Sequence, residues 1–521
     1  MLLLAAMGAA GGWIAVAPVA AQSDLRLVTA AQEQDRETIR SLLAAGVDVN
    51  ARRADGATAL LWAAHWNDLD LIDRLVKAGA HVDGADDQGV TALGLACENG
   101  STPVAARLLI AGANPNLAQQ NGVTPLMSAA RTGNVGLVRA LLARHADVSA
   151  TIPTSRQTAL IWATAERHHE VMRELIAAGA DVHARSSIGF SALLFASRNG
   201  DIEAAKLLIA SGAGVNELGS DGTHALPLAI VSGHEEFARF LLEQNADPNG
   251  QMAGVNALHA AAGTVDVWLR DWLRARRVSV FARNIASLVP ARRLPLVRSL
   301  LERGADPNAR ISTSSVLGLA ISGRNGAFDT FSVGTGDIKG ATPLWVAAYE
   351  ANRPPPGASD AGEIVRVLLA AGADPSLTTV DGTTPLMVAA GIGHPTYRPG
   401  VPRGTRTPTA EAAVKWLVEA GADVHAVNEA RFTALHGAAF RGLNEVIQYL
   451  VDQGADINAR DFLGRTAYRI AEGGPQAFQF QAWPETAAFL RTLGADTALG
   501  VDGRTAERER SRRKLEESGK P

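Results

Sequence analysis

Apolar and polar residues follow one another over residues 433–461 in a pattern that predicts two short helices, each closed by a turn. Thr433 is a favourable N-cap, because its side-chain oxygen accepts a hydrogen bond from an unpaired N–H of the first turn. Small apolar residues follow, and Gly442 ends this helix because glycine adopts the left-handed conformation without strain. The second helix ends at Gly454 and carries its apolar residues at helical spacing: Val446, Ile447, Leu450 and Val451. Neither helix is long enough to be stable alone, so the pattern predicts an array of neighbouring copies.

The position of Thr433, called the anchor from here on, recurs along the chain, mostly every 32 to 34 residues. The anchors are Thr58, Thr91, Thr124, Thr158, Ser191, His224, Asn256, Thr342, Thr384, Thr433 and Thr466. Their copies read, for example, TALLWAA, TPLMSAA and TALHGAA, and a second landmark such as GADVH or GADIN closes each unit. A period of about 33 residues with a T-P-L-H-x-A core is the signature of ankyrin repeats.

On these motifs the chain resembles the ankyrin-repeat family over roughly residues 24–510. The resemblance implies an all-α solenoid of about 11 repeats plus capping units, in which each repeat is a helix-turn-helix with a β-hairpin-like tip. Residues 24–50 lack the anchor motif but align as a first helix pair that caps the array. The family's repeats are binding scaffolds for unrelated partners, so the resemblance implies a fold more sharply than a function.

Departures from the regular spacing divide the chain into parts. Residues 22–262 form a regular N-terminal array, residues 263–496 carry insertions, and residues 497–521 are a charged cap or tail. Four insertions fall between the first and second helix of a repeat, and a fifth enlarges a tip. They occupy 264–292, 350–361, 391–410, a short stretch between Thr466 and Asp496, and, in the tip, 311–338. Insertions on one face of a solenoid often mark its binding face.

Residues 1–21 are apolar and alanine-rich, and they end in small residues before Gln22. This composition predicts a signal peptide cut near Ala21, although its basic leading region is missing; a membrane anchor is the alternative. Export of a chain without disulfides predicts a periplasmic or secreted protein of bacterial origin. No stable membrane insertion is expected after cleavage.

Composition narrows the classes of partner. The formal net charge of −4 and pI near 6.3 do not indicate a protein that binds nucleic acid or acidic lipid. The one cysteine, Cys97, excludes a disulfide framework and a zinc site built from cysteine pairs. Because it lies in an apolar run, we expect Cys97 to be a small buried residue.

Two insertions contain residues suited to recognition. Residues 265–284 predict an amphipathic helix in which Trp268 and Trp272 share one face beside several arginines. This face packs back on the solenoid, binds a partner protein, or lies on a membrane surface. A second insertion, with His394 and Tyr397, is rich in Gly, Pro and Arg, and is either a recognition loop or a solvated excursion.

Catalytic and cofactor motifs are absent from the sequence. The glycines of residues 331–340 do not form a phosphate-binding loop, and neither HExxH nor GxSxG occurs. His259 and His436 occupy the histidine position of the repeat core, where the imidazole is expected to hydrogen-bond within and between repeats. We therefore predict neither a cofactor nor a metal site, and no enzymatic activity.

The resemblance also implies a binding surface, because the end of the first helix lines the concave face of such arrays. The seventh and eighth residues after each anchor escape the apolar pattern there. They are His65, Trp66, Glu98, Asn99, Arg131, Thr132, Ala165, Glu166, Arg198, Asn199, Tyr349, Glu350, Phe440 and Arg441. This mixture of aromatic, arginine and asparagine side chains suits protein recognition, and a merely solvated groove is the alternative.

These observations predict a monomeric, non-catalytic scaffold that binds another protein through its concave face and its C-terminal insertions. Two other functions stay open. One is a secreted effector, or an immunity protein that inhibits a partner. The other is an enzyme or cofactor-binding protein whose site is built by the C-terminal insertions. Clustered arginines, His394 and Tyr397 are the reason to consider it.

Overall fold

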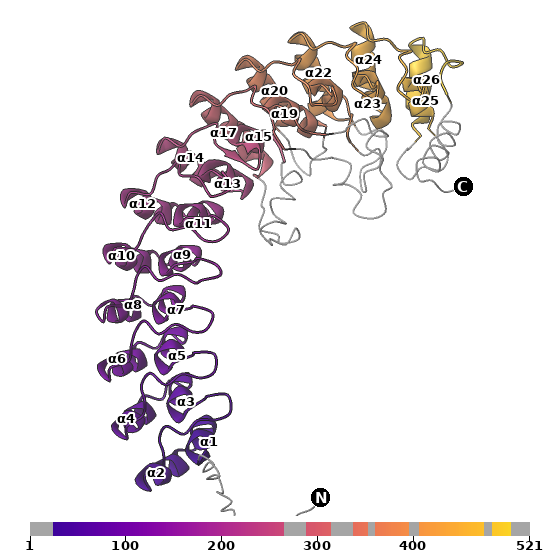
Figure 1. Cartoon of the computed structure of the whole chain (residues 1–521). Coiled ribbons are helices and arrows are strands. Elements are labelled where there is room, and N and C mark those ends of the chain that lie inside the picture. Colours follow the sequence, from indigo (N-terminus) through magenta and orange to yellow (C-terminus); the bar gives the residue numbers. More distant parts are fainter. Residues whose placement is uncertain are drawn as a thin grey trace, which may run out of the picture. The chain divides into compact units, whose positions relative to one another are not determined.

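A computed structural model describes residues 24–264, 288–313, 337–352, 360–394, 406–473 and 482–501 (Figure 1). Within these ranges the chain repeats one motif, a first helix, a tight turn, a second helix and an extended tip. The all-α repeat fold predicted from the sequence is confirmed. The chain divides into two compact units, Met1–Asp181 and Val182–Pro521, here called unit 1 and unit 2.

Unit 1 contains five helix pairs among its described residues. Its first helices lie in one layer and its second helices in another (Figure 1). The pairs are α1 (Arg26–Glu33) with α2 (Arg36–Ala44), α3 (Ala59–His65) with α4 (Leu69–Lys77), α5 (Ala92–Glu98) with α6 (Thr102–Ile110), α7 (Pro125–Thr132) with α8 (Val135–Leu142), and α9 (Ala159–Ala165) with α10 (His169–Ala177). The pair α1 and α2 is the predicted N-terminal capping unit.

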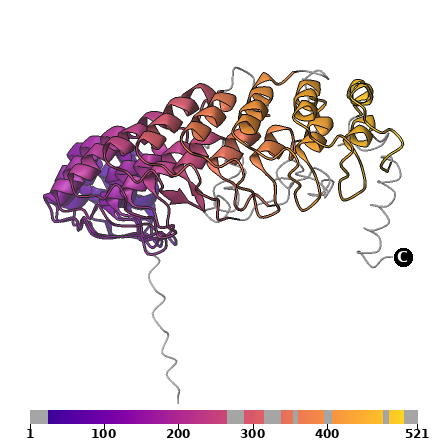
Figure 2. The ribbon, with the colours of Figure 1, turned by 90° about the horizontal axis from the view of Figure 1, so that it is seen from above.

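Unit 2 continues the motif through seven described helix pairs, which Figure 2 shows side by side from magenta to yellow. They are α11 (Ala192–Asn199) with α12 (Ile202–Ala210), α13 (Ala225–Val231) with α14 (Glu235–Glu243), α15 (Ala257–Ala262) with α17 (Pro290–Glu302), α19 (Pro343–Ala351) with α20 (Ala361–Ala370), α21 (Pro385–Ala389) with α22 (Pro408–Glu419), α23 (Ala434–Arg441) with α24 (Asn444–Asp452), and α25 (Ala467–Glu472) with α26 (Pro484–Thr492).

Four of the insertions predicted from the spacing do fall between a first and a second helix, after α15, α19, α21 and α25. The fifth precedes α19, in a tip, as predicted. The inserted sequences themselves lie largely outside the described residues. So do residues 1–23 and 502–521, and the predicted signal peptide, amphipathic helix and charged tail stay predictions.

The anchors act as the N-caps that the sequence predicts. Each anchor threonine has extended backbone angles, and its side-chain oxygen accepts a hydrogen bond from the backbone N–H three residues on. Asn256 does the same, whereas Ser191 and His224 make no side-chain cap bond. A short helix therefore starts at the same place in almost every repeat.

The core lies between successive helix pairs. In α5, Ala92, Leu93, Gly94, Ala96 and Cys97 are all buried. Small side chains on this face let neighbouring first helices approach closely, while larger aliphatic residues of the second helices fill the remaining space. The prediction for Cys97 is confirmed, because it is fully buried and burial raises the pKa of its thiol.

Most tips are tight, hairpin-like turns, in which a backbone N–H bonds the carbonyl four residues on, as Asp86 N does to Val90 O at 3.1 Å. Within the described residues one short antiparallel pair forms, between β1 (Gln251–Met252) and β2 (Val255–Asn256), with isolated bridges in two other tips. Backbone bonds and asparagine side chains join successive tips. For example, the Asn116 amide donates to His145 O at 3.1 Å and accepts from Asp147 N at 2.7 Å. Because each tip is tied to the next, the first helices keep a constant register.

Candidate protein-interaction surface

The C-terminal ends of the first helices carry most of the residues predicted to bind a partner, and the following repeat fixes their backbone. The side chain ten residues after an anchor bonds to a carbonyl in the last turn of the preceding first helix or just beyond it. His168 Nε2 donates to Arg131 O at 2.9 Å, and Asn134 Nδ2 donates to Gly100 O at 2.8 Å. In unit 2, His234 and Trp483 bond the carbonyls of Arg198 and Phe440 in the same way. Terminal helix carbonyls that would otherwise lack partners are thereby satisfied.

This contact requires a glycine, which has no Cβ, at the end of the first helix. Gly442 ends α23 with φ 68°, and a Cβ there would lie 2.8 Å from the Trp483 ring. Gly133 ends α7 with φ 75°, and a Cβ would lie 2.6 Å from the His168 ring. Glycine therefore serves two purposes here, the left-handed conformation and the close approach of a ring.

In unit 1, an aromatic cluster lies at the end of α3. Trp62 and Trp66 stack with ring centroids 6.4 Å apart, and His65 packs its edge against both rings. Trp66 Nε1 donates to Gln32 O at 3.2 Å, which fixes the indole against the capping repeat. The Trp66 side chain nevertheless stays 42% exposed. A large apolar side chain that is rigid and exposed is the kind of group that anchors protein interfaces.

A second aromatic group lies two to three repeats further on, at the end of α7 and on α9. The Arg131 guanidinium lies 5.4 Å from the centre of the Trp162 ring. Trp162 Nε1 donates to Gln157 Oε1 at 3.1 Å. The arginine and the indole thus form a cation–π pair at the surface of unit 1.

The other predicted residues of unit 1 mostly lie on the same surface. Asn99 is exposed and its amide donates to His65 O at 3.0 Å, which joins the ends of α5 and α3. Glu98 is half-buried and accepts from Gln119 Nε2 at 2.6 Å. Thr132 and Glu166 are exposed, and Ala165 is half-buried.

In unit 2, the predicted residues have more varied surroundings. Arg198 is exposed and lies 4.9 Å from the centre of the Phe195 ring, while Asn199 is half-buried. Tyr349 is half-buried, because His394 stacks on its ring at 4.0 Å and its hydroxyl donates to Gly393 O. Glu350 accepts from Thr264 at the end of the α15 repeat.

The prediction that Phe440 lies at the surface is wrong. Phe440 is 4% exposed, because Phe432 packs against its ring and the Arg465 guanidinium lies 5.6 Å from its centre. The neighbouring Arg441 is largely enclosed too, and burial lowers its pKa to about 10. Trp268, Trp272 and Tyr397 lie outside the described residues, so their role stays a prediction.

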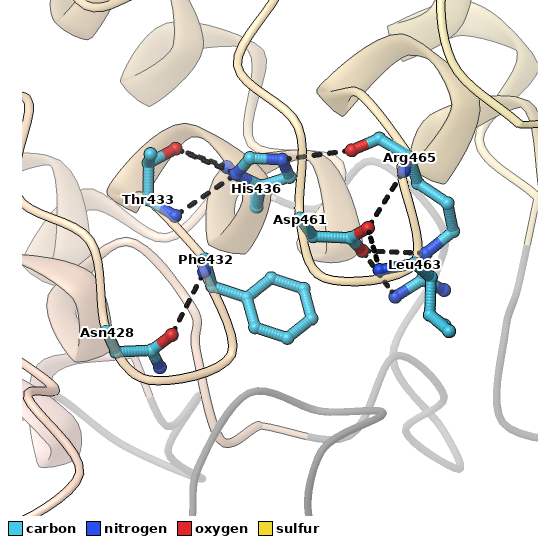
Figure 3. Close-up of polar contacts among 7 residues, drawn as sticks. All are labelled: Asn428, Phe432, Thr433, His436, Asp461, Leu463 and Arg465. Carbon is cyan, nitrogen blue, oxygen red and sulfur yellow. Dashed lines mark hydrogen bonds and ion pairs between the residues drawn. The ribbon is translucent and has the colours of Figure 1, made fainter.

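The two histidines of the repeat core, His259 and His436, behave as predicted, and Figure 3 shows the contacts of His436. His436 Nδ1 accepts from Thr433 N at 3.1 Å, and its Nε2 donates to Arg465 O in the next tip at 3.2 Å. His259 donates to Ala341 O at 3.1 Å in the same way. Both rings are buried, and desolvation lowers the pKa of each, so both are neutral at pH 7.

Figure 3 also shows a buried ion pair beyond His436, between Asp461 and Arg465, whose shortest N–O distance is 2.7 Å. Asp461 accepts in addition from the backbone of Leu463 and Arg465. Further back, Asn428 orders the turn before Phe432 and donates to Thr383 of the previous tip. Polar bonds therefore run through three successive tips of unit 2.

Comparison with known proteins agrees with this repeat geometry. The profile described as ankyrin repeats, three copies long, matches residues 27–117, 95–186, 174–252, 193–269 and 357–461, which is more than half of the chain. The chain belongs to the ankyrin-repeat family. Ankyrin repeats generally mediate protein–protein interaction.

Individual ankyrin proteins each match part of this chain. The chain is 33% identical over 157 residues to alpha-latroinsectotoxin-Lt1a of Latrodectus tredecimguttatus, covering 30% of this chain and 9% of the toxin. It is 33% identical over 149 residues to human ankyrin repeat and SOCS box protein 16, covering 28% of each. The human ASB11 ankyrin repeat domain is 26% identical, with a TM-score of 0.37, over 41% of this chain and 96% of that domain. The chain thus spans under a third of these two full-length relatives.

Among the described residues, no group of three or more histidine, cysteine or acidic side chains is arranged to hold a metal ion. No helix in that part of the chain is long and apolar enough to cross a membrane.

Sequence reasoning missed two sets of residues in the ankyrin array. The first is the tryptophan four residues after an anchor, Trp62 or Trp162, which is not among the residues predicted to bind a partner. Tryptophan at the same position of TALLWAA and TALIWAT was the available signal. The second is the side chain ten residues after an anchor, which bridges repeats. His168 and Asn134 each stand ten residues after their anchors, and this shared position was the available signal.

Proposed function

We propose that this chain is a non-catalytic scaffold that binds another protein through the ends of its first helices, chiefly in unit 1. The observation that carries the proposal is Trp66, an indole held by a hydrogen bond and two ring contacts yet 42% exposed. Membership of a family of protein-interaction modules supports it. The cation–π pair of Arg131 and Trp162 extends the same surface along the repeats.

We also propose that the chain is exported. The support is the apolar, alanine-rich stretch of residues 1–21 with small residues before Gln22. Determining the N-terminal residue of the chain purified from its host tests this, because a start other than Gln22 or a close neighbour would contradict cleavage there.

Affinity purification after crosslinking in the native host tests the binding proposal. The wild-type chain should recover one specific protein, and Trp66→Ala should weaken its recovery by about ten-fold or more, as truncation of an interface anchor does. Arg131→Ala should weaken it less, because that guanidinium also contacts Trp162. Ile110→Ala is the matched control, since Ile110 is 70% exposed but lies on a second helix. Undiminished recovery by both surface variants would remove the claim.

A further inference from the structure

We propose that the end of α3 and the neighbouring acidic tip bind an extended, positively charged segment of the partner, with an arginine or lysine side chain over Trp66. This inference rests on the proposed function and specifies the chemistry of the partner. The aromatic cluster (Trp62, His65 and Trp66) and the acidic edge (Asp86, Asp87 and Glu98) together form what we call the cation surface.

The aromatic cluster is preorganised to accept a cation. Trp62 and Trp66 lie with their planes 23° apart, and His65 stands nearly perpendicular to both. The bond from Trp66 Nε1 to Gln32 O fixes the indole, so little side-chain entropy is lost on binding. The face of an indole carries negative potential, and tryptophan is the aromatic side chain that attracts cations best.

One tryptophan of the array already has a cation over its ring. Arg131 is the seventh residue after its anchor and lies over Trp162, the fourth residue after the next anchor. The residue in the position of Arg131 relative to Trp62 is Gln32, which is uncharged. Within the described residues, no arginine or lysine lies over Trp62 or Trp66. Trp162 thus has an arginine of its own chain over its ring, whereas Trp62 and Trp66 can accept a cation from the partner.

Charge beside the aromatic cluster favours a basic segment. Between Lys77 and Arg107 the sequence has no lysine or arginine but contains four acidic residues, Asp83, Asp86, Asp87 and Glu98. The last three lie in the tip before α5 and at the end of α5. Residues 108–130 carry no charge at all, and Arg131, the first cation of the next repeat, lies over Trp162.

Backbone contacts place this acidic edge next to the tryptophans. The Asn99 amide donates to His65 O, so the Glu98 end of α5 lies against the Trp66 end of α3. Asp87 N donates to Asp55 O at 3.0 Å, which joins the acidic tip to the tip that precedes α3.

The nearby arginines are already engaged. Arg52 donates to Ala85 O at 2.6 Å, and Arg53 bonds the Gln32 side chain and lies 4.0 Å from Asp55. Arg52 partly offsets the charge of Asp87, because its Nη2 and Asp87 Oδ1 would both lie 2.8 Å from a Cβ placed on Gly56. Within the described residues, Asp86 and Glu98 form no ion pair, so these two carboxylates supply the negative charge of the acidic edge.

Fluorescence anisotropy with labelled peptides and the full chain tests the proposal. The probes are short peptides that repeat Gly-Ser-Arg, Gly-Ser-Lys or Gly-Ser-Glu. The arginine and lysine peptides should bind and the glutamate peptide should not. Raising salt from about 50 mM to about 300 mM should weaken binding, because the charges are at the surface.

Two surface variants separate the aromatic and electrostatic contributions. Trp66→Leu keeps an apolar side chain but removes the ring, and should weaken arginine-peptide binding about three-fold to five-fold. The double variant Asp87→Asn with Glu98→Gln should weaken binding by a similar factor and flatten its salt dependence. Glu37→Gln changes the same charge on α2, away from this surface, and should change nothing. Far-UV circular dichroism confirms that each variant is folded.

Several results would overturn the proposal. They are equal binding of the glutamate peptide, no measurable binding of the basic peptides, or unchanged affinity in both surface variants. If the native partner is still lost with Trp66→Ala while the basic peptides do not bind, the proposed function stands and this inference alone fails.

Discussion

Single side chains hold neighbouring repeats together in this protein, and His259 is the clearest case. Its Nε2 donates to Ala341 O, although 82 residues separate the two. His436 makes the equivalent bond to Arg465 across only 29 residues. Both acceptors immediately precede the next anchor. The same side-chain bond therefore closes a regular repeat and one enlarged by two insertions.

The buried histidines predict how stability depends on pH. Burial lowers the pKa of His259 from its ordinary 6.5 to about 4, so the folded chain binds fewer protons than the unfolded chain between these values. The stabilisation is complete above about pH 6.5 and is lost as pH falls towards 4, by up to about 3 kcal/mol. In His259→Gln, the urea midpoint should therefore change less between pH 7 and pH 4.5 than in the wild type.

His425→Gln is the control for this measurement, since His425 is exposed in a tip. An unchanged pH dependence in His259→Gln would show that other groups govern the acid transition.

At the scale of elements, the end of each first helix depends on the next repeat. Trp483 covers Gly442 and donates to Phe440 O at 2.9 Å. Gly454 also has a left-handed backbone, φ 88°, but a Cβ there would meet nothing within 4 Å. Comparing substitutions at these two glycines therefore separates the free-energy cost of left-handed strain from the cost of losing the ring contact.

Gly442→Ala should therefore destabilise unit 2 more than Gly454→Ala does. Both variants suffer left-handed strain of about 1–2 kcal/mol. Gly442→Ala also displaces the Trp483 ring, and losing its hydrogen bond should add about 1 kcal/mol. Urea unfolding of the two variants measures the difference, and equal losses would mean that the ring contact contributes nothing.

The sequence predicted the helix pairs and their caps well, because an anchor threonine and a glycine act locally. It predicted the surface less well, because exposure depends on which side chain arrives from another repeat. Phe440 is the example. Its position matches that of the exposed His65, yet Phe432 and Arg465 cover it. Sequence spacing alone cannot reveal such covering residues, since Phe432 precedes the anchor of the same repeat and Arg465 precedes the next one.

At the scale of the whole molecule, two compact units predict unfolding in more than one step. In a repeat array each repeat contacts mainly its neighbours, so cooperativity is limited. Leu75 in unit 1 and Leu450 in unit 2 are both fully buried. Leu75→Ala and Leu450→Ala should each cost about 2–5 kcal/mol, but each should shift a different part of the urea curve followed by circular dichroism. Displacement of one common transition by both variants would show that the units unfold together.

Trp483 makes the contacts that the bridging side chain makes in a regular repeat, although residues 474–481 lie in the chain between α25 and α26. Its backbone N–H bonds Ala471 O at 2.7 Å, and its indole reaches Phe440 O as it would in an uninterrupted repeat. The junction between the glycine of a first helix and the side chain ten residues after the anchor is therefore a natural grafting point. A foreign peptide spliced between Gly133 and Asn134 of a regular repeat should be displayed by the array without any redesign of its packing.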